Sequence, residues 1–171
     1  MQATVKQITK VLLIDDDREE FYILQTAIHD ISPAITVSHS GVLVDDFAKS
    51  DIHTYDLIFL DINMPPTDGF EWLLKIRKLG CSVPVVMYST TMNQNRINKA
   101  YQAGAHLFLP KPNNFADLIQ SLTRIFQLNW LNPEEVKQQF FRNGNYLPFV
   151  RENSESDFPG LFSENILPEA C

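Results

Sequence analysis

Polar side chains of a few types stand directly after four short apolar runs of the sequence. They are Asp15 and Asp16, then Asp61, then Ser89 and Thr90, and finally Lys111. Carboxylates that are brought together repel one another, so a cluster of them needs a cation or a proton. Oxygen ligands without histidine or thiol favour a hard ion such as Mg²⁺. Acids, a divalent ion, a lysine and a hydroxyl together make a pocket for a phosphoryl group, and one carboxylate can attack phosphorus directly.

Apolar runs and amphipathic stretches alternate along most of the chain. The runs lack polar alternation, which is typical of a parallel sheet covered on both faces, and they span 11–14, 35–37, 56–60, 83–88 and 106–109. Helices are predicted over about 21–31, 42–48, 70–79, 95–103 and 115–126. Five such units predict an α/β fold with a doubly wound, five-stranded parallel sheet. Ligands bind such sheets at the carboxyl ends of the strands, where the polar side chains named above fall.

Asp61 is the best-placed nucleophile, because it ends the most apolar run and should lie at the centre of the sheet. Each residue also has a purely structural interpretation. The acids from Asp15 to Asp17 can cap a helix, and Asp61 can form a turn. Lys111 alone would be a surface lysine and Ser89 a loop hydroxyl. Four separate strand ends that each supply a fitting group favour the functional interpretation, with Asp17 alone predicted to be a cap.

Composition limits the classes of protein to consider. The chain has 171 residues, of which 44% are hydrophobic and 20% charged, as in a soluble globular protein of one domain plus an appendage. The net charge of −7 makes a nucleic acid an unexpected partner, because such binding needs clustered cations. No apolar run approaches the ~20 residues of a membrane-spanning helix, and the N-terminus lacks a signal-peptide core. We therefore expect a cytoplasmic protein with no membrane partner.

Four segments of the sequence resemble the receiver domain of bacterial two-component response regulators (CheY-like). They are VLLIDDD (11–17), FLDINMPPTDG (59–69), MYST (87–90) and FLPKP (108–112). Their agreement in order and spacing is far more specific than a single motif. The resemblance implies a receiver domain over residues 8–129 with the flavodoxin-like strand order 2-1-3-4-5. It also implies phosphorelay signalling, in which a histidine kinase or histidine phosphotransfer protein supplies a phosphoryl group that switches partner binding.

The resemblance assigns the acids to phosphoryl acceptance and to metal binding. Asp61 would be the phosphoacceptor. Asp16 and Asp61 would bind Mg²⁺ through their carboxylates, and Asp15 would bind it through a water molecule. Asn63 would add its backbone carbonyl as a further ligand.

The resemblance also assigns the residues that bind the phosphoryl group and respond to it. Ser89, Thr90 and Lys111 would contact the phosphoryl oxygens, and a cis Lys111–Pro112 peptide would aim the amine. Phe108 would be the switch aromatic, which rotates inward as Ser89 moves. No catalytic residue beyond Asp61 and Lys111 is implied, so the protein would be a signalling module with at most slow self-dephosphorylation, not an enzyme.

Residues 130–171 form a C-terminal extension beyond the resemblance. A proline at position 133 and two following glutamates predict one short helix, to about Arg142, and then a loop-like tail. The extension lacks the length and charge of a helix-turn-helix, so a stand-alone receiver without a DNA-binding output domain is expected. Its many aromatic residues either pack back on the domain or dock on a partner or a second copy of the chain. A homodimer or partner would use the face made by the fourth helix, fifth strand and fifth helix.

Two rival hypotheses come from other classes of protein. A phosphohydrolase of the haloacid-dehalogenase type also has a nucleophilic aspartate at a strand end, within an Asp-x-Asp pair. Asn63 takes the place of the second aspartate here, so the general acid/base would be missing. The other rival is a scaffold that keeps the pocket and is never phosphorylated.

Overall fold

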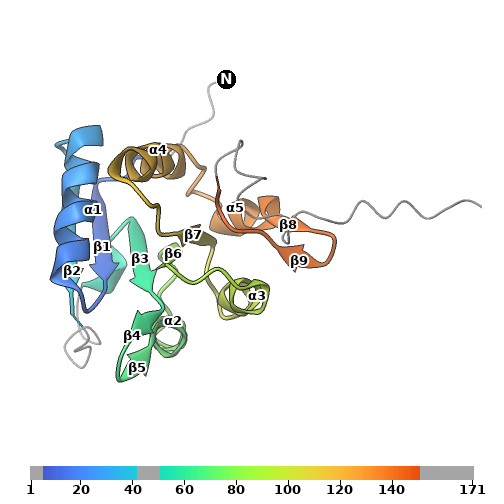
Figure 1. Cartoon of the computed structure of the whole chain (residues 1–171). Helices are drawn as coiled ribbons and strands as arrows, with labels where there is room; N and C mark the ends of the chain where they lie inside the picture. The colour runs from blue at the N-terminus through green and yellow to red at the C-terminus, as the bar shows by residue number, and fades with distance from the viewer. Residues whose placement is uncertain (1–5, 42–50, 151–171) are drawn as a thin grey trace, which may run out of the picture.

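Five parallel strands form one sheet in the computed structural model, which describes residues 6–41 and 51–150 (Figure 1). The strands are β1 (Lys10–Ile14), β2 (Thr36–Ser40), β3 (Leu57–Asp61), β6 (Val85–Ser89) and β7 (Leu107–Pro110). Their order across the sheet is β2-β1-β3-β6-β7, and every neighbouring pair is parallel. Numbered along the chain, this is the predicted order 2-1-3-4-5, so the fold prediction is confirmed.

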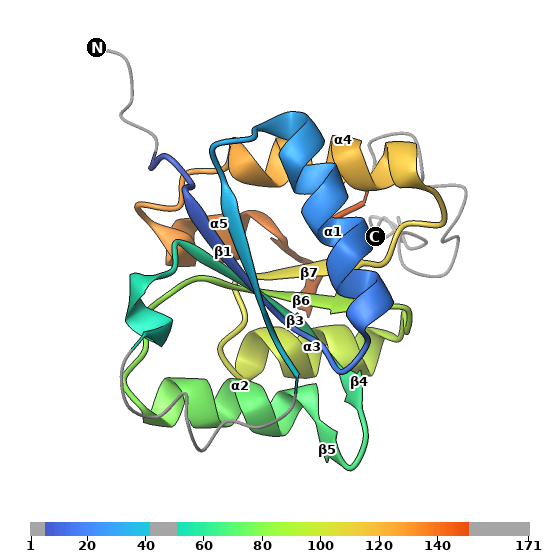
Figure 2. The ribbon, with the colours of Figure 1, turned by 90° about the vertical axis from the view of Figure 1, so that its left-hand side faces the viewer.

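Helices cover both faces of the sheet. They are α1 (Arg18–Ile31), α2 (Gly69–Lys78), α3 (Gln94–Gln102) and α4 (Phe115–Phe126). Figure 2 shows α1 and α4 on one side and α2 and α3 on the other. Successive strand residues point to opposite sides, so that Leu13 joins the core under α1 and α4 while Leu12 joins the core under α2 and α3. This burial of both faces explains why the strand sequences are continuously apolar, apart from that of the outer strand β2, which is mostly polar and only partly buried.

The helices α1, α2, α3 and α4 each begin after a residue whose side chain caps the helix. Asp17 precedes α1, and its carboxylate accepts a hydrogen bond from the backbone N–H of Glu19 at 2.8 Å, so the prediction that Asp17 is a cap is confirmed. Asp68 caps α2 in the same way, at 2.6 Å from the nitrogen of Phe70. The helix expected over 42–48 lies outside the described residues. Among the residues described, no helix has both the length and the apolar character needed to cross a bilayer.

Several short elements lie between the strands of the main sheet and after its last helix. After β3 the chain forms a small antiparallel hairpin from β4 (Asn63–Met64) and β5 (Thr67–Asp68). A 3₁₀ turn, η2 (Ile52–Thr54), precedes β3. Beyond α4 come α5 (Pro133–Gln139) and a second hairpin, β8 (Phe141–Arg142) with β9 (Asn145–Tyr146).

The extension differs from its prediction in two ways. The helix ends at Gln139 and not near Arg142, and the segment expected to be loop-like contains the β8–β9 hairpin. The physical reason is the two-residue turn, because Asn143 and Gly144 both adopt positive φ, of 50° and 81°. That backbone conformation matches the twist of paired strands and cannot continue a helix.

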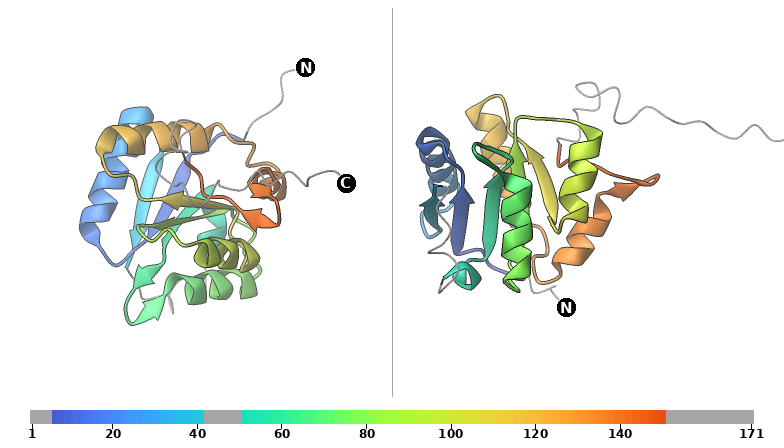
Figure 3. Two further views of the ribbon diagram at one scale, coloured as in Figure 1. Left: turned by 45° about the vertical axis from the view of Figure 1, so that its right-hand side comes forward. Right: turned by 90° about the horizontal axis from the view of Figure 1, so that it is seen from below.

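The described part of the extension packs back on the domain (Figure 3). Trp130, Val136 and Phe149 are buried in the same core as α1 and α4, and the Trp130 indole donates a hydrogen bond to the carbonyl of Ile125 at 2.8 Å. Of the two alternatives left open for the aromatic side chains, packing in cis therefore holds for these residues. Residues 151–171 lie outside the described range.

Candidate functional site

Three acids meet where β1 and β3 end. Ile14 and Leu60 are partners in the parallel register, so the following Asp15 and the terminal Asp61 leave the sheet at the same level. Asp15, Asp16 and Asp61 each offer a carboxylate oxygen within 4.8 Å of the others. Asp15 and Asp61 are buried and Asp16 is exposed. These oxygens face a pocket of about 460 Å³. All the residues that line it are polar or charged: Asp15, Asp16, Asp17, Glu20, Asp61, Asn63 and Lys111.

Lys111 reaches the acids from the end of β7. Its Nζ lies 3.1 Å from Asp15 Oδ2, 3.8 Å from Asp61 Oδ1 and 3.6 Å from Glu20 Oε1. Burial alone would lower the pKa of Lys111, but the three carboxylates outweigh it and raise that pKa above its ordinary value. The amine is therefore a fixed positive charge at neutral pH. It compensates the acids only in part, since one cation faces several carboxylates.

Asp61 carries a buried carboxylate oxygen that no hydrogen bond from the described residues compensates. Its Oδ1 is buried and has no hydrogen-bond partner among the described residues, because 3.8 Å to the lysine is too long for one. Burial raises the pKa of Asp61 to about 6, with Lys111 opposing the change and Asp15 adding to it. A buried oxygen without a partner is rare and calls for a functional explanation. Such an oxygen can bind a cation or act as a nucleophile.

Ser89 and Thr90 lie differently from one another. Ser89 ends β6 and is fully buried, and its Oγ accepts hydrogen bonds from the Thr91 backbone N–H (3.3 Å) and the Asn63 side-chain amide (3.5 Å). It is thus connected to the pocket through Asn63. Thr90 is exposed and is not among the lining residues of the pocket, so the structure does not bring it to the acids.

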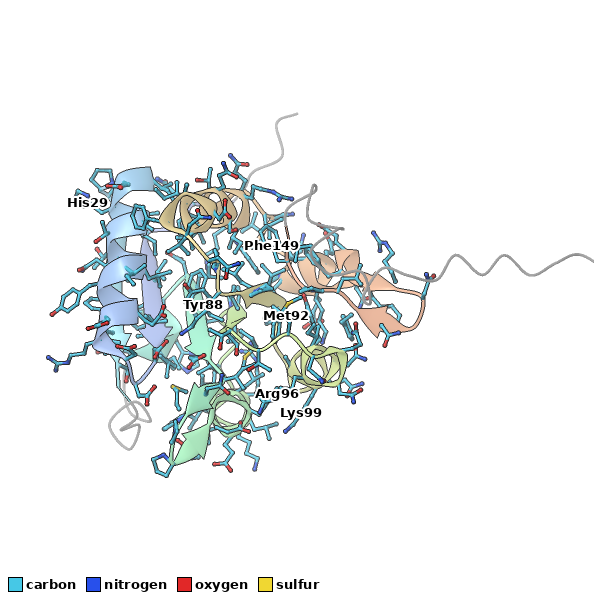
Figure 4. All side chains as sticks on the ribbon, viewed as in Figure 1. His29, Tyr88, Met92, Arg96, Lys99 and Phe149 are labelled. Carbon is cyan, nitrogen blue, oxygen red and sulfur yellow. The ribbon has the colours of Figure 1, made fainter. Side chains whose placement is uncertain are left out.

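Two charged residues that lie in or beside the pocket, Glu20 and Arg96, were not predicted from the sequence. Glu20 lies one helical turn after Asp16, a spacing that could have indicated it. Arg96, which Figure 4 labels on α3, donates a hydrogen bond to Asn63 Oδ1 at 3.2 Å. No local pattern predicts this contact, because 33 residues separate the two side chains in the sequence.

Two expectations for the end of β7 differ from the structure. The Lys111–Pro112 bond is not cis, and the cis peptide among the described residues is Pro65–Pro66. The lysine needs no such bond to be aimed, because its backbone N–H donates to the Ser89 carbonyl at 2.9 Å and its long side chain spans the remaining distance. Phe108 is already fully buried, so an inward rotation has no exposed starting position. The aromatic residues Phe140 and Tyr146 of the extension pack against the core that holds it.

Comparison with known proteins identifies the family. The model of the response regulator receiver domain matches residues 11–123. The transcriptional regulatory protein TctD of Salmonella typhimurium (strain LT2) is 30% identical over 129 residues, which cover 75% of this chain and 57% of TctD. The two-component response regulator ORR26 of Oryza sativa is 27% identical over 128 residues, covering 75% of this chain and 22% of ORR26. The chain thus spans little more than half, or less, of the length of these relatives.

Solved structures agree with the sequence comparison. The chemotaxis protein CheY4 of Vibrio cholerae is 26% identical with a TM-score of 0.59, covering 69% of this chain and 98% of CheY4. The phosphorylated cyanobacterial phytochrome response regulator RcpA is 26% identical with a TM-score of 0.60, covering 72% of this chain and 94% of RcpA. Sequence family, strand order and the acidic pocket at the strand ends lead to one conclusion: this chain belongs to the response regulator receiver domain family.

Proposed function

We propose that Asp61 accepts a phosphoryl group from a histidine kinase or histidine phosphotransfer protein, and that this modification switches the binding of a partner. The observation that carries the proposal is the buried Asp61 Oδ1, which lacks a hydrogen-bond partner in the described part of the chain and lies 3.8 Å from a lysine amine. RcpA, which is similar over 72% of this chain, has been crystallised in phosphorylated form, and this supports the same chemistry here.

The pocket is suited to a divalent ion, and we assign Mg²⁺ to it. Asp15, Asp16 and Asp61 supply hard oxygen donors close enough to share one ion, and the unpartnered Asp61 oxygen gives it a natural ligand. The backbone carbonyl of Asn63, which lines the same pocket, is proposed as a further ligand. When bound, the ion would supply positive charge that offsets both the repulsion among the acids and the charge of an incoming phosphoryl group.

The transfer step needs little from the chain beyond charge and position. An Asp61 oxygen attacks the phosphorus of a phosphohistidine, an O–P bond forms, and the N–P bond breaks with its electron pair staying on the imidazole. The carboxylate must be ionised to attack. Because the pKa of Asp61 is about 6, most molecules meet that condition at pH 7. Lys111 stays protonated and pairs with the phosphoryl oxygens.

Ser89 can donate a hydrogen bond to a phosphoryl group on Asp61. Its Oγ is the acceptor in both of its hydrogen bonds, to Thr91 and to Asn63, so neither bond uses the hydroxyl hydrogen. Phe108 follows as the proposed reporter of a change at Ser89, since Ser89 and Pro110 are partners in the β6–β7 register. Thr90 is proposed only as a minor contact, because its side chain is exposed.

Labelling with a small phosphodonor tests the proposal. We expect acetyl phosphate with Mg²⁺ to add one phosphoryl group per chain, located at Asp61 by peptide mapping, and the variant Asp61→Asn to take up none. Asp30→Asn is the matched control, because Asp30 is an exposed carboxylate on α1 outside the pocket. Labelling that persists in Asp61→Asn, or no labelling of the native chain, contradicts the proposal. The second result would favour the scaffold hypothesis.

A phosphohydrolase has less support from the site. The position that would hold the general acid is Asn63, and its amide side chain is bonded to Ser89, Thr91 and Arg96. An amide cannot give up a proton to a leaving group at neutral pH. Steady turnover of a small phosphate ester would nevertheless reverse this assignment.

A further inference from the structure

Residues 140–150, here called the strap, lie across the face made by α3, β7 and α4. Polar contacts attach the strap to α3. Gln94 donates to the Tyr146 carbonyl at 2.7 Å, while Asn98 accepts from the Tyr146 backbone N–H and donates to the Asn145 side chain, both at 2.9 Å. The rings of Tyr101 and Tyr146 stack with centroids 4.4 Å apart. These contacts therefore fix the position of the strap along α3.

The strap is also bonded to the backbone of β7 at Phe108. The Phe149 N–H donates to the Phe108 carbonyl at 2.7 Å. On the other side of the same residue, the Phe108 N–H donates to the Tyr101 hydroxyl at 3.2 Å, and that hydroxyl donates to the Leu147 carbonyl at 3.0 Å. Both backbone polar groups of Phe108 thus connect to the strap, one directly and one through Tyr101.

The far end of the strap is held by α4. Phe149 is buried, with Phe140 beside it at a ring-centroid distance of 5.8 Å, and Figure 4 labels it next to α4. The Arg124 guanidinium lies 5.0 Å from the ring centroid of Phe149 and donates to the Val150 carbonyl at 3.5 Å. A single segment of the extension thus bridges two helices and the strand between them.

The site and the strap share β7, which is only four residues long. Lys111 follows its last residue, and the Lys111 N–H donates to the Ser89 carbonyl at 2.9 Å. A phosphoryl group on Asp61 would attract the Lys111 amine and the Ser89 hydroxyl. A shift of this strand end moves Phe108, three residues away, relative to α3 and α4. Hydrogen bonds of 2.7–3.2 Å weaken on displacement, so such a shift loosens the strap.

We infer that the α3–β7–α4 face is an interaction surface whose occupant is this chain's own strap, and that phosphorylation of Asp61 releases the strap from it. The inference rests on the proposed function of Asp61 and adds the element that responds. Linkage makes the coupling reciprocal: the factor by which a bound phosphoryl mimic favours the released strap equals the factor by which the released state binds the mimic more tightly than the closed state. Release uncovers the backbone of β7 and the polar row of α3 for a partner.

Hydrogen exchange in the full-length protein tests release. We expect saturating beryllofluoride with Mg²⁺ to speed exchange of the Phe149 amide by about tenfold or more, because its bond to Phe108 opens. Strand amides in β1 serve as the internal reference and should not change. Bound beryllofluoride with unchanged exchange at Phe149 overturns the inference and leaves the proposed function intact. Failure of the mimic to bind overturns both.

A pair of variants tests the reciprocal direction. In Gln94→Ala/Asn98→Ala, which removes contacts to the strap and none to the acids, we expect fast Phe149 exchange without the mimic. If these changes release the strap fully, the variant should also bind beryllofluoride more tightly, by the factor by which the mimic favours release in the native chain. Asn95→Ala, an exposed neighbour on the same helix, should leave both unchanged. Exchange of the Phe149 amide at the rate of an unstructured chain, with unaltered affinity for beryllofluoride, would disprove the coupling.

Discussion

Replacing Asp61 by asparagine should stabilise the metal-free protein at pH 8. Asp61 is 5% exposed and its Oδ1 has no hydrogen-bond partner among the residues described. Burial first, and Asp15 second, raise its pKa from 3.8 to about 6 against the opposing charge of Lys111. That change corresponds to about 3 kcal/mol against the ionised form in the folded protein. An amide carries no charge, so the free energy of unfolding should rise by up to about 3 kcal/mol.

The sign of this effect depends on pH. The folded protein holds the Asp61 proton more tightly than the unfolded chain does, since the pKa is about 6 in the fold and 3.8 outside it. The stability contributed by Asp61 is therefore fully present below about pH 3, falls as the pH rises through 3.8 to about 6, and stays low above that. The gain in the free energy of unfolding from Asp61→Asn should be absent at pH 3 and complete at pH 8.

Urea unfolding with a chelator at several pH values measures this advantage. Saturating Mg²⁺ at pH 8 should narrow the difference, because an ion stabilises the native carboxylate but gains little from the amide. The control Asp30→Asn alters an exposed carboxylate and should change stability by less than about 0.5 kcal/mol at every pH. An Asp61→Asn effect that is independent of pH, or a loss of stability at pH 8, would refute the reasoning.

Two further predictions concern the same pocket. Because Asp61 must lose its proton to bind a cation, the apparent affinity for Mg²⁺ should fall about tenfold per pH unit below pH 6, as followed by titration calorimetry; a flat profile from pH 7.5 to 5 would contradict this. The Gly69→Ala variant should lose more than about 2 kcal/mol in urea unfolding, because a Cβ there overlaps the Asp61 backbone carbonyl. Gly41→Ala, where a Cβ meets no atom within 4 Å, is the control, and equal losses would count against the explanation.

The fold could be predicted from the sequence because its main signals are local. Every strand of the sheet except β2 is a short apolar run, and the acids and lysine follow the ends of those runs, so a parallel sheet must bring Asp15, Asp61 and Lys111 to one edge. The structure does so. The β8–β9 hairpin was also readable, since Asn143-Gly144 is the pair that a two-residue turn of this type requires.

Contacts between distant side chains could not be predicted in this way. The hydrogen bond from Gln94 to Tyr146 joins residues 52 apart, and no periodicity marks either of them. The exposure of Thr90 likewise depends on how the loop after β6 turns, which the motif around Ser89 does not specify. The peptide between Lys111 and Pro112 was wrongly expected to be cis, because that expectation came from the resemblance and not from the residues.

Because β7 is an outermost strand of the sheet, its position determines what happens when the chain is truncated after the receiver domain. An outer strand with free backbone groups is a template on which other chains add, and proteins usually protect it. Here the Phe149 backbone N–H donates a hydrogen bond to the Phe108 carbonyl, on the side of β7 that faces away from β6. A fragment cut at residue 129 would keep every proposed site residue yet expose this strand. The last residues of the described chain therefore protect this strand against self-association for as long as they stay bonded to it.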